Sequence, residues 1–356
     1  MTVSDKDQFI FEELAQLSKT VEGTSGVPPL LKDKLESMIK RLNRMAQLGH
    51  YSSEFDIISR YIETISQIPW DKRTEDTLDL VKTKQLLDST HYGMDGVKEM
   101  ISEYLATLIL IKQRGGDMFA KTPVLLFVGL QGVGKTTLAK SISDALGRKF
   151  VRIAMGGIGS TLELRGKSKS YPEADPGQIV KALMRTQVKN PVILLDEIEK
   201  ASGEKGLLSD IMAILLEILD PKQNHEFRDH YVDFPIDLSE VMFICSANNT
   251  GTISTALMDR MEVIKMPSYT DQEKMVIAKT YLMPQIFEKS GLQEGELLID
   301  EGLWPGIVRP FGYDTGIRSL SRTLESICRK VAKQIVEGSA QQVQLTEENL
   351  KDYLPR

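Results

Sequence analysis

Residues 124–136 read VLLFVGLQGVGKT, an apolar run followed at once by a glycine-rich turn. The turn from Gly129 to Thr136 matches the spacing G-x-x-x-x-G-K-S/T and opens a helix that we expect to end at Gly147. Glycines in such a turn let backbone N–H groups converge on phosphate oxygens, and the helix N-terminus adds the positive end of its dipole. Lys135 can bridge two phosphates, and the Thr136 hydroxyl can hold Mg²⁺. The alternative is a chance glycine-rich turn, which the flanking strand and helix disfavour.

Five short apolar runs rich in β-forming residues occur in the middle of the chain, with helical segments between several of them. They start at Val124, Phe150, Val192, Val241 and Met261. Strands that are apolar on both faces and alternate with helices indicate a parallel sheet covered on both sides. The sequence therefore predicts a nucleotide-binding α/β fold with a parallel five-stranded sheet.

The part before this sheet has a helical pattern. Apolar residues recur every three or four positions over 31–45 and again over 53–68, as one face of a helix would require. Residues 22–29, EGTSGVPP, are typical of a flexible linker. The apolar stripes are expected to serve packing rather than binding.

The part after the sheet is also expected to be helical. Thr270 and Glu273 have the spacing of a capping box, and an apolar stripe over 317–335 predicts a long amphipathic helix. We therefore predict three domains, which are a helical domain or linker over 1–78, the α/β nucleotide-binding domain over 79–268 and a small all-α domain over 269–356.

Residues 192–197, VILLDE, place two carboxylates at the end of an apolar run. Asp196 and Glu197 would emerge at the carboxyl edge of the sheet, where parallel sheets bind their ligands. Beside a phosphate loop, Asp196 would lie near Mg²⁺ and Glu197 would polarise the attacking water. The alternative is an acidic helix cap, and the upstream phosphate loop favours the catalytic interpretation.

Three further polar residues are candidates for stabilising the charge that develops in phosphoryl transfer. Asn248 ends the run VMFICSAN and could hold the attacking water together with Glu197. Arg260 precedes the fifth run and could reach a neighbouring subunit's nucleotide, whereas Arg318 begins the long C-terminal helix and could contact the γ-phosphate. Taken alone, Asn248 could be a strand-end turn and either arginine a surface salt bridge.

Composition excludes several classes of protein. The 356 residues are 41% hydrophobic, enough for a large core, and carry a net charge of −6, which disfavours a duplex-binding domain. Cys245 and Cys328 lie in no zinc or disulfide pattern. The first residues lack a signal-peptide pattern, and the apolar stretches are too short to span a bilayer. A cytoplasmic location fits, or the mitochondrial matrix in a eukaryote.

Several stretches are more particular than the phosphate loop, and together they resemble the ATPase region of the Lon protease family of AAA+ ATPases. The resemblance runs from about residue 28 to residue 353 and is carried by IPWDKRTED (68–76), HYGMDGVKE (91–99), NPVILLDEIEK (190–200), LLEILDPKQNHEFRDHY (215–231) and VMFICSANNT (241–250). It implies an AAA+ P-loop ATPase with ATP and Mg²⁺ as cofactors, which hydrolyses ATP to unfold and thread proteins.

The resemblance also implies a role for each candidate residue. The nucleotide would be bound by Gly129, Gly132, Val133, Gly134, Lys135, Thr136 and Thr137, with His91 and Tyr92 beside the adenine. Mg²⁺ would be held by Thr136 and Asp196. The catalytic residues would be Glu197 of Walker B, Asn248 as sensor 1, Arg260 as the arginine finger and Arg318 as sensor 2.

The loop that grips substrate in the family's pore carries an aromatic–hydrophobic–glycine tip, and the matching residues here are Tyr171, Pro172 and Glu173. Tyr171 keeps the aromatic ring, which can wedge against an unfolded chain. Pro172 would stiffen the loop, and Glu173 would make the entrance of the pore acidic. We hypothesise that grip is weakened or biased towards basic segments; the alternative is that this loop is simply variable.

Family members are homohexameric rings that act on unfolded or misfolded proteins, and these are the partners that the resemblance implies. They also carry a serine–lysine peptidase domain and a larger N-terminal domain, and no such segments occur in these residues. We expect either a fragment of a longer protease or a peptidase-less Lon-like chaperone. A nucleic-acid-remodelling AAA+ ATPase is disfavoured by the acidic composition, and a scaffold without turnover by the full set of catalytic residues. No membrane partner is expected.

Overall fold

The computed structural model describes residues 5–48, 53–119, 122–171, 173–201, 207–309 and 316–355. The chain divides into two compact units. The first unit comprises residues 1–78, 106–126 and 143–263, and the second comprises residues 79–105, 127–142 and 264–356. The domain boundaries expected from the sequence stay a prediction.

The five predicted strands form one parallel five-stranded sheet, which confirms the predicted α/β class. The strand order is β2-β3-β6-β1-β7. The strands are β1 (Val124–Val128), β2 (Phe150–Ala154), β3 (Val192–Asp196), β6 (Met242–Ala247) and β7 (Met261–Lys265). Strand β3 pairs in parallel with β2 and with β6, and all five of its residues are buried. Burial on both faces explains its unbroken apolar run.

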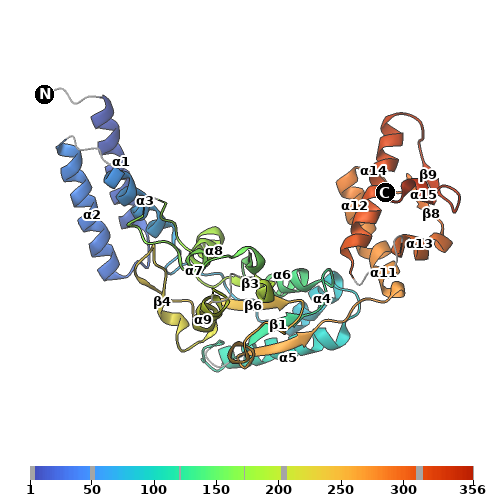
Figure 1. The fold of residues 1–356 in the computed structure, drawn as a ribbon, viewed down its shortest axis with the longest axis horizontal. Helices are drawn as coiled ribbons and strands as arrows, with labels where there is room; N and C mark the ends of the chain where they lie inside the picture. The colour runs from blue at the N-terminus through green and yellow to red at the C-terminus, as the bar shows by residue number, and fades with distance from the viewer. Residues whose placement is uncertain are drawn as a thin grey trace. The chain divides into compact units, whose positions relative to one another are not determined.

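Three helices at the start of the first unit pack on one another (Figure 1). They are α1 (Asp5–Gly23), α2 (Pro29–Gln47) and α3 (Ser53–Gln67). The predicted stripe of α2 is buried at Leu31, Leu35 and Leu42. Met38 and Met45 are only partly buried, because Ile39 and Ala46 occupy the inner positions. The predicted linker is shorter than expected, since α1 continues to Gly23 and α2 begins at Pro29.

The first unit also contains shorter helices that pack against strand β2 and against one another. Helix α8 packs against β2, and α7 packs against α8 and α9. The further helices are α7 (Thr161–Arg165), α8 (Gln178–Thr186), α9 (Leu207–Leu219) and α10 (Thr255–Met258), with 3₁₀ turns at Met155–Gly157, Ile198–Lys200 and Asn224–Glu226. An antiparallel pair of strands, β4 (Phe227–Arg228) and β5 (Pro235–Ile236), was not expected from the sequence.

Helix α4 (Leu80–Thr90) belongs to the second unit. Helices α5 (Asp95–Gln113) and α6 (Lys135–Ala145) have residues in both units. The Asp79 carboxylate caps α4 by accepting the N–H groups of Val81 and Lys82. Helix α6 ends at Ala145, and Gly147 follows with a φ of +68°, close to the predicted end.

The C-terminal part of the second unit is helical, as predicted. Its elements are α11 (Asp271–Ile277), a π-helical turn (Ala278–Leu282), α12 (Met283–Ser290), β8 (Leu297–Ile299), a 3₁₀ turn (Glu301–Leu303), α13 (Trp304–Val308), α14 (Arg318–Val336), β9 (Val343–Leu345) and α15 (Leu350–Tyr353). The capping box of Thr270 and Glu273 is present in full. A short parallel pair, β8 with β9, adds to the helices and was not predicted.

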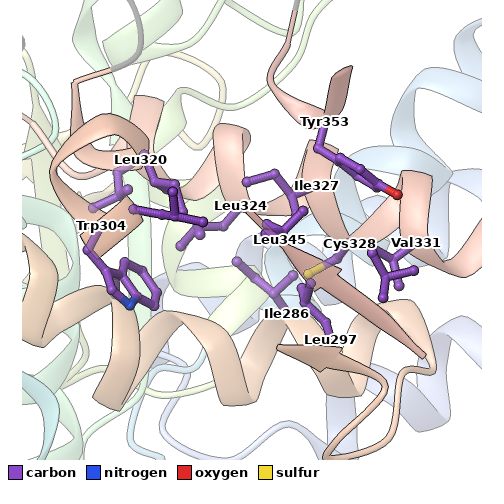
Figure 2. Packing of buried hydrophobic residues seen from close by; sticks show 14 of the residues in the cluster. Ile286, Leu297, Trp304, Leu320, Leu324, Ile327, Cys328, Val331, Leu345 and Tyr353 are labelled. Carbon is purple, nitrogen blue, oxygen red and sulfur yellow. The ribbon is translucent and has the colours of Figure 1, made fainter. Parts of the chain in front are cut away.

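One hydrophobic cluster holds this C-terminal part together (Figure 2). The inner face of α14 supplies Leu320, Leu324, Ile327 and Val331, which confirms the predicted amphipathic stripe. Trp304 of α13 packs against the same face (Figure 2). Across the described ranges, no helix combines the length and the apolar composition that crossing a lipid bilayer requires.

Candidate functional site

The glycine-rich turn connects β1 to α6, the context that its motif requires. Gly132 and Gly134 have φ angles of +81° and +101°, which L-residues with a side chain rarely adopt. Val133 between them is buried. The glycines therefore shape a loop whose backbone can turn towards an anion at the N-terminus of α6.

The Lys135 side chain lies folded back across this loop. Its ammonium group donates to the carbonyl oxygens of Gly129 and Leu130, the second at 3.1 Å. Only 7% of Lys135 is exposed. Thr136 follows in the first turn of α6 and is partly exposed. The loop therefore holds a buried cation next to a row of backbone groups, which suits binding of phosphate.

His91 joins the segment before α5 to the helix of the phosphate loop. Its Nε2 lies 3.1 Å from the Thr137 hydroxyl, and that hydroxyl donates to the carbonyl of Gly134 at 2.8 Å. Its Nδ1 lies 2.9 Å from the Thr90 hydroxyl. Burial, followed by the nearby charge of Lys98, lowers the pKa of His91 to about 4. The imidazole is therefore neutral at pH 7 and serves as a hydrogen-bonding link.

The start of α14 rests on the same loop. The backbone N–H of Ile317 donates to the carbonyl of Gly132 at 3.0 Å. A Cβ on Gly132 would lie 3.1 Å from the Cα of Gly316 and 3.4 Å from the backbone nitrogen of Arg318, and the φ of +81° also disfavours a side chain at this position. The structure thus brings the backbone of Arg318 to the phosphate loop, with its side chain exposed.

The two carboxylates at the end of β3 have different surroundings. Asp196 is buried, and its oxygens accept from the Ser246 hydroxyl and, at 2.5 Å, from Nε of Arg152. Ser246 also accepts the backbone N–H of Glu197 at 3.1 Å. Glu197 has a left-handed backbone with a φ of +59°, and one of its side-chain oxygens accepts from Lys200 at 2.9 Å.

Asn248 contacts the carboxylate of Glu199. Its side-chain N–H donates to Oε1 of Glu199 at 2.6 Å. Glu199 is buried, and its second oxygen has no hydrogen-bond partner among the described residues. Asn248 and Glu197 therefore both lie at the 198–200 turn, each held by a residue that the sequence analysis had not singled out.

Arg260 and Tyr171 lie in the first unit. Arg260 pairs with Asp220 at 3.0 Å and also donates to the carbonyl of Ala256 at 3.1 Å, while a third of its side chain stays exposed. Tyr171 is 63% exposed, and Glu173 is exposed too. Pro172 lies outside the described residues.

Two known protein families match separate parts of this chain. Residues 125–269 match the family described as "ATPase family associated with various cellular activities (AAA)". Residues 288–344 match the "Lon protease AAA+ ATPase lid domain". The chain is a Lon-type AAA+ ATPase region. The phosphate loop lies in the first of these two matches, and α14 lies entirely in the second.

Whole-chain relatives agree with the two domain matches. The chain is 39% identical to "Lon protease 2" of Thermus thermophilus over 99% of its own length and 46% of that protein. It is 41% identical to "Lon protease" of Halothermothrix orenii, with 92% and 40% covered, and 39% identical to "Lon protease 1" of Bacillus subtilis, with 99% and 46% covered. The chain therefore spans less than half the length of these relatives.

The Lon-type ATPase region binds nucleotide. No group of three or more His, Cys, Asp or Glu side chains in the described part of the chain could hold a metal by itself. Mg²⁺ usually takes one or two carboxylates and completes its shell with water and phosphate oxygens. The Asp196 carboxylate and the Thr136 hydroxyl are oxygen donors of this type.

Sequence reasoning missed four polar residues around the carboxylates: Arg152, Ser246, Glu199 and Lys200. Ser246 alone had a visible signal, because a hydroxyl interrupts the apolar run of β6. Arg152 becomes a neighbour of Asp196 through the pairing of β2 with β3. Glu199 and Lys200 lie in the turn that follows β3.

Proposed function

We propose that this region is the ATP-driven motor of a longer protease, which uses hydrolysis to unfold proteins and pull them through a ring. The observation that carries the proposal is the contact of Ile317 with Gly132. It sets the N-cap residue of α14 on the loop that would bind the phosphates. Loss of the γ-phosphate would therefore shift the start of α14. The helix would pass this shift on to the rest of the region that matches the lid domain, residues 288–344.

In the proposed catalytic step, the chain's own residues position and stabilise the reacting groups. Lys135 would turn from its carbonyl partners to the β- and γ-phosphates, and Arg318 would meet the γ-phosphate from α14. Glu197 would leave Lys200 to polarise the attacking water, with Asn248 beside it. Bound Mg²⁺, held through Thr136 and Asp196, would neutralise developing charge on the phosphates. Tyr92, exposed next to His91, would line the adenine side.

The strand order supports convergence of these groups. Parallel strands present their carboxyl ends at one edge, and only β6 lies between β1 and β3 in the sheet. The phosphate loop follows β1, the acidic pair ends β3, and Asn248 follows β6. One nucleotide at that edge would reach all three.

The proposed substrates are unfolded proteins, since the relatives are named as proteases, and Tyr171 would grip them. Six copies in a ring would let Arg260 act on a neighbour's nucleotide, after release from Asp220. In the longer protein, peptide-bond cleavage would belong to another domain. A cytoplasmic location stays a prediction.

A subunit-mixing experiment tests the shared site. Arg260→Ala removes the donated arginine and Lys135→Ala removes phosphate binding, so each variant alone should be nearly inactive. In a 1:1 mixture, about a quarter of the sites would pair an intact phosphate loop with an intact neighbouring arginine, and ATPase activity should reappear. Light scattering would show whether rings form. No recovery in rings that do assemble would contradict action between subunits.

A further inference from the structure

The loop 166–177 is closed at its base by the buried carboxylate of Asp229. One carboxylate oxygen accepts the backbone N–H of Gly177 at 2.7 Å. The other accepts the N–H groups of Tyr231 and Val232 at 2.8 and 3.1 Å. The loop and the turn 229–233 are therefore joined at their bases.

Two helices of the N-terminal segment hold the same turn. Tyr61 of α3 is almost fully buried, and its hydroxyl donates to the carbonyl of Val232 at 2.8 Å. Its ring lies 5.7 Å from that of Tyr231, centroid to centroid. From α2, Lys34 places its Nζ 3.3 Å from the Asp233 carboxylate. The turn is thus fixed from both helices.

Lys169 completes the junction from the loop side. Its Nζ lies 4.5 Å from the centroid of the Tyr61 ring and 3.8 Å from the Asp233 carboxylate. A cation within about 6 Å of a ring centroid is attracted by the negative face of the ring. Lys169 is two residues before Tyr171, whose N–H donates to Ser168 at 3.0 Å.

We propose that Tyr61 and Asp233 position the loop through Lys169, and that the N-terminal helices thereby set where Tyr171 stands. The consequence for substrate grip rests on the proposed function of Tyr171. Lys169, Tyr61 and Asp233 are positioning residues in this arrangement, and a displacement of α2 or α3 would be passed to the tip of the loop.

Amide hydrogen exchange on this chain tests the positioning directly. The N–H groups of Tyr171 and Ala174 are bonded inside the loop, to Ser168 and Tyr171. Lys169→Met should make both amides exchange about three- to tenfold faster, because the loop loses its anchor. Lys169→Arg keeps a cation over the ring and should stay close to the original rate.

Lys167→Met is the matched control, because it removes the same charge from an exposed position of the same loop. It should leave the exchange of both amides within about twofold. Tyr61→Leu should speed the exchange of both amides at least as much as Lys169→Met, because it removes the hydrogen bond to Val232 as well as the ring beneath Lys169. Adding Lys169→Met to Tyr61→Leu should change the exchange little further, since the ring is already gone. Unchanged exchange in Lys169→Met, or full additivity with Tyr61→Leu, would overturn the inference.

The link to substrate is measured separately. Basal ATPase activity should be the same in Lys169→Met and Lys167→Met, while Lys169→Met should need about three- to tenfold more unfolded protein for half-maximal stimulation. Faster exchange with unchanged stimulation would support the positioning contact and count against the proposed role of Tyr171. Unchanged exchange would overturn the positioning contact whatever the stimulation shows.

Discussion

Nε2 of His91 lies 3.1 Å from the hydroxyl oxygen of Thr137, so the segment before α5 is bonded to the helix that begins at the phosphate loop. Ser141, one turn further along α6, donates to Thr90 at 3.1 Å, and Thr90 in turn bonds Nδ1 of His91. In a neutral imidazole one ring nitrogen donates and the other accepts, so His91 can bond to both hydroxyl groups at once. His91 therefore braces the phosphate loop.

Removing this brace should weaken nucleotide binding without altering base selectivity. His91→Leu keeps much of the volume but loses both hydrogen bonds, and we expect ATP affinity to fall about five- to twentyfold. Tyr92→Leu is the matched control on the adenine side and should change the ratio of ATP to GTP affinity. Titration of both variants with both nucleotides measures this. A changed ratio in His91→Leu would show that the imidazole reads the base instead.

His91 should also make the fold less stable in acid. Because its folded pKa of about 4 lies below the unfolded value of 6.5, the unfolded chain binds a proton first as the pH falls. Its contribution is fully present above pH 6.5 and is lost between pH 6.5 and 4, by about 3 kcal/mol. Urea unfolding of the chain and of His91→Leu across this range gives the difference, which should shrink as the pH falls.

Asp229 should make the fold less stable as the pH rises, which is the opposite of the effect of His91. Burial raises the pKa of Asp229 to about 6, although the N–H groups of Gly177, Val232 and Tyr231 lower it. A raised folded pKa stabilises the protein below the unfolded value of 3.8, and this contribution is lost as the pH rises to 6, by about 2 to 3 kcal/mol. Asp229→Asn cannot titrate, so its stability relative to the parent chain should improve over pH 4 to 6. A constant difference would mean that Asp229 stays ionised.

Lys135→Ala should abolish nucleotide binding. The β- and γ-phosphates lose the cation that the loop holds ready, and the affinity for ATP should drop at least about a hundredfold. Lys140→Ala, at an exposed position further along α6, is the control and should bind normally. Retained tight binding in Lys135→Ala would refute the assignment of the phosphate loop.

The sequence predicted the elements that local pattern controls. The five strands follow from apolar runs buried on both faces, and the ends of α6 and α11 follow from Gly147 and from the capping box at Thr270. Strand β8 was missed because three residues give no usable period. The partners of the carboxylates were missed because they depend on which strands become neighbours. Glu199 illustrates this, since nothing in the order of residues reveals that Asn248 would bond to it.

The proposed function requires that the phosphate loop and the acidic pair meet at one nucleotide. The most direct test is a structure of the Glu197→Gln variant with ATP and Mg²⁺, since this variant should bind ATP and hydrolyse it very slowly. We expect one bound nucleotide whose γ-phosphate is contacted by Lys135 and faced by the side chain at position 197, with Asp196 at the metal. A nucleotide that touches the phosphate loop while both carboxylate positions lie out of reach would contradict it.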